Sequence, residues 1–190
     1  MQILATGENG FLLSNILKHF NYEFSDTPDV IFQFGSPIDG LSTNNKIKLD
    51  LALAQTQKFC DNVRQTTHII FASSEGLNDF QDYSNDPYYY DTKIAQERLI
   101  FQNFWKATIL RIPRVYDPSR RNGLMQRIRD GYIDDSNKII KYITLDEFIN
   151  WFFECLYKTR NDTYFRETFK YNGKYHYDTI RGISNWIYQS

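Results

Sequence analysis

Short apolar runs alternate with longer segments of helical spacing over the first 110 residues. The runs have the length of buried strands and are Gln2–Ala5, Val30–Phe34, His68–Ala72 and Ala107–Leu110. Between them, apolar residues recur three or four positions apart, as on one face of a helix, in Phe11–Phe20, Ile47–Val63 and Tyr89–Phe104. Strands that alternate with helices of this length predict an α/β fold in which right-handed crossovers join the strands of a parallel sheet.

The pattern changes after Pro118. The later segments are a basic and partly helical stretch, a strand, an amphipathic helix and a final helix, predicted over Ser119–Asp130, Lys138–Tyr142, Leu145–Tyr157 and Thr179–Tyr188. No internal repeat or low-complexity linker separates the parts. We therefore expect one compact unit, with a core over residues 1–118 and a small cap over residues 119–190 packed on it.

The segment between Phe24 and Val30 is too short for an ordinary βαβ unit. Five residues separate the two positions, whereas a parallel crossover that contains a helix needs about a dozen. Tyr22–Phe24 and Val30–Phe34 therefore cannot be consecutive parallel strands of the usual kind. We expect this part of the fold to be shortened.

Composition and charge narrow the classes of partner. The 190 residues are 42% hydrophobic and 24% charged, which is ordinary for a soluble globular protein. Because 22 basic residues balance 23 acidic ones, the net charge of −1 provides no field that attracts nucleic acid or an anionic membrane. No apolar run approaches the roughly 18 residues that span a bilayer, and the N-terminus lacks a signal-peptide pattern. We expect a cytoplasmic protein.

The two cysteines indicate neither a disulfide nor a metal site. Cys60 and Cys155 lie far apart in apolar, helix-like segments and form no CxxC or metal-ligand pattern. We expect buried free thiols and no bound metal.

A glycine-containing turn follows the first predicted strand. Thr6-Gly7-Glu8-Asn9-Gly10-Phe11-Leu12 joins that strand to the first predicted helix. Glycines in such a turn let the backbone bend tightly and approach a pyrophosphate, which then lies on the amino-terminal N–H groups of the helix. The alternative is a plain turn between a strand and a helix.

Serine, tyrosine and lysine follow one another after the third predicted strand. Ser73 and Ser74 end that strand, and Tyr89 and Lys93 lie on the next predicted helix, four residues apart and so on one face. A phenol with a pKa of about 10 needs an adjacent cation to exchange protons near neutrality. With 14 tyrosines in the chain, about one Tyr-x-x-x-Lys match is expected by chance. Here the match falls on the helix directly after the serine-bearing strand.

Together the two motifs resemble those of the extended short-chain dehydrogenases/reductases, a family that includes NAD-dependent epimerases and dehydratases of nucleotide-activated sugars. The opening pattern of that family is TGxxGFLG, and Leu13 stands here in place of its last glycine. Weaker resemblances to other family segments occur at Asp29–Ser36, Ile109–Pro118 and Tyr142–Glu147. The resemblance thus covers the whole chain, patchily in its last third.

The resemblance implies a role for each motif residue. Tyr89 is expected to act as general acid/base, Lys93 to lower the pKa of Tyr89 and hold the nicotinamide ribose, and Ser74 to hydrogen-bond the reacting oxygen. The expected contacts of NAD or NADP are Gly7, Gly10, Phe11, Leu12, Asp26, Gly35, Ser36 and Lys93. The expected substrate contacts are Ser73 and Arg114. The other basic residues are interpreted as part of a solvated helix face, and contact with a diphosphate is the alternative. These residues are Arg120, Arg121, Arg127 and Arg129.

Departures from the family pattern indicate a shortened and partly degenerate member. Leu13 replaces the glycine that allows close packing of the helix on the strand and leaves a path for the cofactor. Arg114 stands where the family has asparagine, and Asp117 where it has glycine. The short segment before Val30 implies that the adenosine half of the site is trimmed. The expected fold is a Rossmann-like three-layer parallel sheet, trimmed by one or two βα units, with a small C-terminal cap.

The sequence is compatible with two functions. The preferred one is an NAD(P)-dependent epimerase, dehydratase or reductase acting on a nucleotide-activated sugar, which accounts for serine, tyrosine and lysine in register. The alternative is a non-catalytic descendant that serves as a binding or assembly subunit with an impaired cofactor site, which Leu13, Asp117 and the missing unit favour. The motifs do not distinguish between sugars, between reaction subtypes, or between NAD and NADP.

The resemblance also implies a homodimer. Family members often pair through a four-helix bundle, which here would use helices 54–63 and 94–104. Phe101, Phe104 and Trp105 supply apolar groups for such an interface. The alternative is that these side chains cover the sheet.

Overall fold

The structure, a computed structural model, describes residues 1–35, 46–78, 87–120, 123–131, 137–159 and 164–189. Its strands are β1 (Gln2–Thr6), β2 (Glu23–Phe24), β3 (Val30–Gln33), β4 (His68–Ser74), β5 (Lys106–Ile112), β6 (Val115–Tyr116), β7 (Ile139–Thr144), β8 (Phe165–Lys170) and β9 (His176–Thr179). Its helices are α1 (Phe11–Leu17), α2 (Lys46–Asn62), the short 3-10 helix η1 (Glu75–Asn78), α4 (Pro87–Asn103), α5 (Gly123–Arg129), α6 (Leu145–Thr159) and α7 (Ile180–Gln189).

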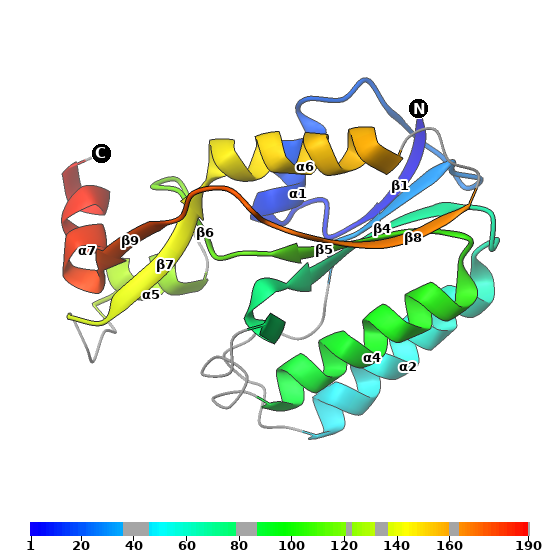
Figure 1. Cartoon of the computed structure of the whole chain (residues 1–190), viewed down its shortest axis with the longest axis horizontal. Coiled ribbons are helices and arrows are strands. Elements are labelled where there is room, and N and C mark those ends of the chain that lie inside the picture. The colour runs from blue at the N-terminus through cyan, green and yellow to red at the C-terminus, as the bar shows by residue number, and fades with distance from the viewer. Residues whose placement is uncertain (36–45, 79–86, 121–122, 132–136, 160–163, 190) are drawn as a thin grey trace.

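Six strands of the described residues form one parallel sheet, in the order β2-β1-β3-β4-β5-β8. Figure 1 shows α1 and α6 on one face of this sheet and α2 and α4 on the other. The three-layer arrangement confirms the predicted α/β, Rossmann-like fold.

Each face of the sheet has its own apolar core. Side chains alternate across β4, so Ile70 belongs to one core while Ile69 and Phe71 belong to the other. The first core includes Ile16 of α1 and Phe152 of α6, and the second joins the sheet to α2 and α4. Full burial of a side chain of this kind contributes about 1.5–3 kcal/mol, so packing holds both helical layers in place.

The sheet is shortened at the edge formed by β2. β1 lies between β2 and β3 and pairs with both, Ile3 being level with Phe24 on one side and with Val30 on the other. β2 and β3 are thus parallel strands on opposite sides of β1 that no helix joins, so they are not an ordinary βαβ unit, as the sequence predicted. Such a link is possible because β2 has only two residues, and the chain then passes from one side of β1 to the other.

A second sheet, of order β6-β7-β9, forms the cap beside the large sheet (Figure 1). α5 and α7 pack on it around a small core that includes Ile128, Ile140 and Ile183. Two elements of the segment 119–190 pack on or pair with the large sheet and are not part of the cap. α6 covers one face of the large sheet, and β8 pairs with β5. The boundary predicted at residue 118 thus separates the two sheets only in part.

The helices of the predicted dimer interface also cover the sheet. Phe104 is fully buried, with its ring centre 5.9 Å from that of Phe59. Phe104 therefore belongs to the core, because the chain turns inward after α4 to enter β5. Its side chain has no exposed surface that could contact a partner. Phe101 is partly buried against the same core, and Trp105 is exposed. The homodimer itself stays a prediction.

Both cysteines are buried free thiols, as predicted. Burial raises the pKa of Cys60 to about 11 and that of Cys155 to about 12. In the part of the chain that the structure describes, no helix has the length and apolar character needed to cross a bilayer.

Candidate functional site

Several of the predicted site residues lie at one edge of the large sheet, where its parallel strands end. Ladder pairs place Thr6 of β1 beside Gln33 of β3, and Ser73 of β4 beside Arg111 of β5. The turns after β1 and β3, the serines of β4 and the segment after β5 therefore lie along the same edge. Open α/β sheets bind their ligands at this carboxyl edge.

Two glycines let the turns after β1 and β3 touch backbone to backbone. Gly7 has a φ of 80°, in the left-handed region, and a Cβ added there would lie 2.7 Å from the Gly35 nitrogen. Gly10 closes the first turn, since its N–H donates to the Gly7 carbonyl at 2.8 Å. This packing requires glycine at position 7 with or without a ligand, so it suits both a cofactor turn and a plain turn.

Leu13, the main departure from the family pattern, belongs to the core. Its side chain is 1% exposed and clusters with Ile3, Ile16 and Phe32 between α1 and the sheet. The leucine is thus accommodated by packing. Of the other predicted cofactor contacts on α1, Leu12 lies partly against the same core, and Phe11 is half-buried at the start of the helix.

Asp26 lies in the link between β2 and β3. Its neighbours Ser25 and Asp29 donate backbone hydrogen bonds to the carbonyls of Ile3 and Gln2, near the amino end of β1. Asp26 is exposed, closely follows the end of β2, and its ribose contact stays a prediction. The predicted contact at Ser36 lies outside the described residues.

Tyr89 and Lys93 share a face of α4, beside the end of β4. The Lys93 Nζ lies 5.9 Å from the centre of the Tyr89 ring and 5.2 Å from that of Phe71, and it donates to the Ala72 carbonyl at 3.2 Å. Lys93 is 5% exposed, and this burial lowers its pKa to about 8, an effect that Glu97 opposes. α4 thus places a buried amino group beside a phenol.

The two serines of β4 have different surroundings. The Ser74 Oγ accepts a hydrogen bond from the Gly76 N–H at 3.3 Å, at the start of η1. Ser73 is 7% exposed, and its Oγ has no hydrogen-bond partner among the described residues. Because side chains alternate along a strand, Ser73 faces α4 as Phe71 does. Ser73, predicted to contact the substrate, therefore lies in the interior between α4 and the sheet.

A partly buried ion pair in this region was not foreseen from the sequence. The Arg111 guanidinium donates to both oxygens of Glu97, at 2.7 and 3.1 Å. The Glu97 side chain is 7% exposed and lies one helical turn after Lys93. A carboxylate between the buried Lys93 and the partly buried Arg111 offsets part of the cost of removing these charges from water. The i, i+4 spacing of Lys93 and Glu97 was the available indication.

Arg114, the other predicted substrate contact, lies at the junction between β5 and the cap. Its side chain is exposed, and its carbonyl accepts from the Ile143 N–H at 3.0 Å. Arg129 was predicted to lie on a solvated helix face, but it donates hydrogen bonds to the carbonyls of Pro118 and Arg120. That interpretation of Arg129 is therefore wrong, because the carbonyls of Pro118 and Arg120 lie beside its guanidinium.

The cap is joined to this edge through Glu75, which directly follows Ser74. The Glu75 carboxylate accepts a hydrogen bond from the Tyr175 hydroxyl and lies 3.3 Å from the Lys141 Nζ. The same Nζ lies 3.7 Å from the centre of the Tyr175 ring. Burial raises the pKa of Tyr175, and the Glu75 carboxylate adds to the effect. Strand β7 and the segment before β9 are thereby held against the end of β4.

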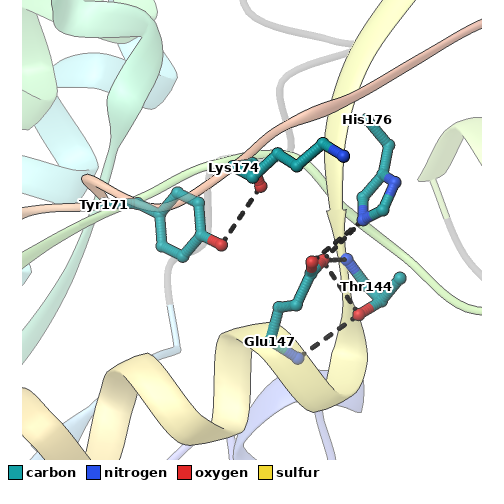
Figure 2. A network of polar contacts seen from close by, with 5 residues as sticks. All are labelled: Thr144, Glu147, Tyr171, Lys174 and His176. Atoms are coloured by element: carbon teal, nitrogen blue, oxygen red, sulfur yellow. Dashed lines mark hydrogen bonds and ion pairs between the residues drawn. The ribbon is translucent and has the colours of Figure 1, made fainter.

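Figure 2 shows a second connection, at the start of α6. The Thr144 N–H donates to Glu147 at 2.8 Å, and the Glu147 N–H donates back to the Thr144 hydroxyl at 3.3 Å, which makes a capping box. The His176 Nε2, on β9, lies 2.9 and 3.0 Å from the two Glu147 oxygens. The residue that caps α6 therefore also contacts a strand of the cap.

The fold and this edge define a class of protein: a Rossmann-like domain with a glycine turn after β1, serines at the end of β4, and Tyr-x-x-x-Lys on α4. Neither the protein-family models nor the curated proteins gave a match to the sequence. Solved structures did.

The similar structures include a reductase, an epimerase and an assembly protein. dTDP-4-dehydrorhamnose reductase from Bacillus anthracis, in complex with NADP, is 14% identical, covers 99% of this chain and 80% of its own, and has a TM-score of 0.68. UDP-glucuronic acid 4-epimerase from Bacillus cereus, in complex with NAD, is 17% identical, with coverages of 100% and 83% and a TM-score of 0.64. The capsular polysaccharide assembling protein CapF from Staphylococcus aureus is 15% identical, with coverages of 100% and 58% and a TM-score of 0.62. At these identities the likeness establishes a shared fold.

Proposed function

We propose that the chain is an NAD(P)-dependent epimerase, dehydratase or reductase of a nucleotide-activated sugar, of the extended short-chain dehydrogenase/reductase family. The observation that carries the proposal is the pair of Tyr89 and Lys93 on one face of α4, beside the strand end that carries Ser74. The similar structures support it, because the reductase was solved with NADP and the epimerase with NAD.

The carboxyl edge fits one half of a dinucleotide better than the other. Gly7 and Gly35 keep side chains out of the turn, so the backbone from Gly7 to Leu12 would hold the diphosphate. On the adenosine side the sheet ends at the two-residue β2, which Asp26 follows in the link to β3. When bound, the nicotinamide supplies hydride transfer.

The proton transfer is assigned to Tyr89. Its phenol would exchange a proton with a hydroxyl or carbonyl oxygen of the sugar, and Ser74 would hydrogen-bond the same oxygen. A positive charge on Lys93, 5.9 Å from the ring centre, stabilises the phenolate. Since the Lys93 Nζ is buried and donates to the Ala72 carbonyl, the proposal gives it this electrostatic role in place of the ribose contact that the resemblance implies.

The test compares Tyr89→Phe with Tyr88→Phe, a matched control because Tyr88 is the preceding residue and is 46% exposed. Conversion of a panel of nucleotide sugars is followed by chromatography with NAD or NADP present. Loss of a general acid/base is expected to lower kcat about 100- to 10,000-fold in Tyr89→Phe, while Tyr88→Phe keeps the wild-type rate. Wild-type turnover by Tyr89→Phe would remove the phenol from the mechanism.

A non-catalytic binding or assembly subunit is the second candidate. The trimmed adenosine side and the buried Lys93 amino group favour it, and CapF, a capsular polysaccharide assembling protein, has the same fold. This candidate predicts that neither NAD(H) nor NADP(H) binds at millimolar concentration. It also predicts that no nucleotide sugar is converted.

A further inference from the structure

Arg120 reaches from the loop after β6 to the glycine turn. Its Cζ lies 5.4 Å from the centre of the Phe11 ring, and Phe11 directly follows Gly10. Its Nη1 donates to the Val115 carbonyl at 2.8 Å. Arg120 precedes α5 and is half-buried, so it does not lie on the solvated helix face that the sequence suggested. A planar cation thus lies beside the turn proposed to hold a diphosphate.

The loop that carries Arg120 is held by its own hydrogen bonds. The Asp117 carboxylate accepts from the Ser119 N–H at 2.8 Å, and the Asp117 carbonyl accepts from the Arg120 N–H at 3.1 Å. Arg129 of α5 donates to the carbonyls of Pro118 and Arg120. Asp117, where the family pattern has glycine, therefore builds the turn that presents Arg120.

The chemistry of a guanidinium suits a diphosphate at this place. Its planar fork matches two phosphate oxygens, and it keeps its charge at any physiological pH. The net charge of −1 gives the chain no general attraction for anions, so a local cation has to supply it. Because the sheet ends at the two-residue β2, a bound dinucleotide would have fewer contacts on its adenosine side, and its diphosphate would have to supply more of the binding free energy.

We propose that Arg120 binds the diphosphate of a nucleotide that lies beside Phe11, next to the turn from Gly7 to Gly10. The inference rests on the proposed function for the identity of the nucleotide, because a dinucleotide cofactor and a nucleoside-diphosphate sugar both carry this group. In either case the loop before α5 contributes a side chain to a site otherwise formed by the large sheet.

The test measures the affinities of NADH, NADPH and UDP by calorimetric titration of wild-type protein, Arg120→Gln, Arg120→Lys and Arg166→Gln. Arg166 is a matched control, since it lies 5.2 Å from the centre of the Tyr164 ring and donates to the Phe104 carbonyl at 2.8 Å, at the amino end of β8. Arg120→Gln removes the positive charge and shortens the side chain while keeping an amide N–H₂ donor. Thermal unfolding of each variant verifies that it is folded.

Loss of the charge in Arg120→Gln is expected to weaken the affinity for the diphosphate ligand about 10- to 100-fold. Arg120→Lys is expected to bind with an intermediate affinity, and Arg166→Gln with the wild-type affinity. Weaker binding of NADH and NADPH alone assigns the contact to the cofactor, and weaker binding of UDP alone assigns it to the sugar nucleotide. Unchanged affinities in folded Arg120→Gln overturn the inference and leave the proposed function intact.

The wild-type titration separates the two proposals. If wild-type protein binds UDP but neither dinucleotide, the proposed function fails, and the Arg120→Gln affinity for UDP alone decides the inference. If wild-type protein binds none of the three ligands, both proposals are overturned.

Discussion

At the scale of single residues, the most constrained position on the carboxyl edge is Gly7. Its φ of 80° strains any other residue, and a Cβ there would lie 2.7 Å from the Gly35 nitrogen. Gly131 has a similar φ of 74° with nothing within 4 Å of an added Cβ. Substitution of Gly131 therefore tests backbone strain alone, whereas substitution of Gly7 tests backbone strain together with a close contact.

Gly7→Ala is expected to lower the free energy of unfolding by about 1–3 kcal/mol more than Gly131→Ala does, because only the former overpacks a contact. Urea denaturation of the two variants measures the difference. Equal losses would show that the turns after β1 and β3 do not touch in solution.

The lowered pKa of Lys93 predicts that the free energy of unfolding increases with pH above about pH 8. Burial lowers its pKa to about 8, against about 10.4 in an unfolded chain. Between these values the unfolded chain binds the additional proton, so this group makes the folded state more stable as the pH rises. Below about pH 8 both states are protonated, and the cost of burying the charge is constant.

Comparison with Lys93→Met isolates the contribution of Lys93 from that of the two buried thiols. The raised pKa values of the thiols make the folded state less stable as the pH rises. From about pH 8 to about pH 10, the free energy of unfolding of the wild type is expected to gain about 1 kcal/mol per pH unit over that of the variant. Urea denaturation across this range measures it. A difference that does not vary with pH would mean that the Lys93 amino group is solvated.

At the scale of elements, the start of α6 links the helix to the cap. Thr144→Val removes the hydroxyl that pairs with the Glu147 N–H while keeping the shape of the side chain. We expect a loss of about 0.5–2 kcal/mol in the free energy of unfolding. Thr168→Val, at an exposed position of β8, is the control and should be neutral in the same urea denaturation. Equal effects would contradict the capping role.

The elements that sequence alone predicted are those with an apolar pattern of their own. β4 is buried at all of its first four positions, so a continuous apolar run marks it. β8 is buried only at Phe165, because it is an edge strand, and no run marks it among the residues assigned to the cap. β2, with two exposed residues, gave no pattern that could place it beside β1.

In the candidate site, too, the sequence predicted what local spacing determines and missed what depends on tertiary packing. Tyr89 and Lys93 were predicted to share a face because helical spacing alone brings residues four apart together. The Tyr175–Glu75 contact joins residues 100 positions apart, and it depends on how the cap docks, which no local pattern encodes. Asp26 was assigned by its distance from the glycines along the chain, whereas its position is set by the register of β2 and β3 on β1.

At the scale of the whole molecule, α2 and α4 are the helices proposed to meet a second copy. They pack on each other through a buried hydrogen bond of 2.9 Å from Gln96 to Thr56, and Ala54 is exposed. Ala54→Arg is expected to convert the predicted homodimer to a monomer, because the interface would have to bury an unpaired charge. Light scattering measures the mass, with Thr168→Arg on β8 as the control. A monomeric wild type would contradict the dimer.

The central claim is that the shortened sheet still holds a nicotinamide cofactor beside Tyr89 and Lys93. It is tested most directly by titrating the wild-type protein with NADH and NADPH while following nicotinamide fluorescence. We expect saturable binding of at least one of them below millimolar concentration, accompanied by a rise in Tm as ligand binding stabilises the folded state. No binding of either at millimolar concentration would contradict the claim and leave the binding or assembly subunit as the account of this fold.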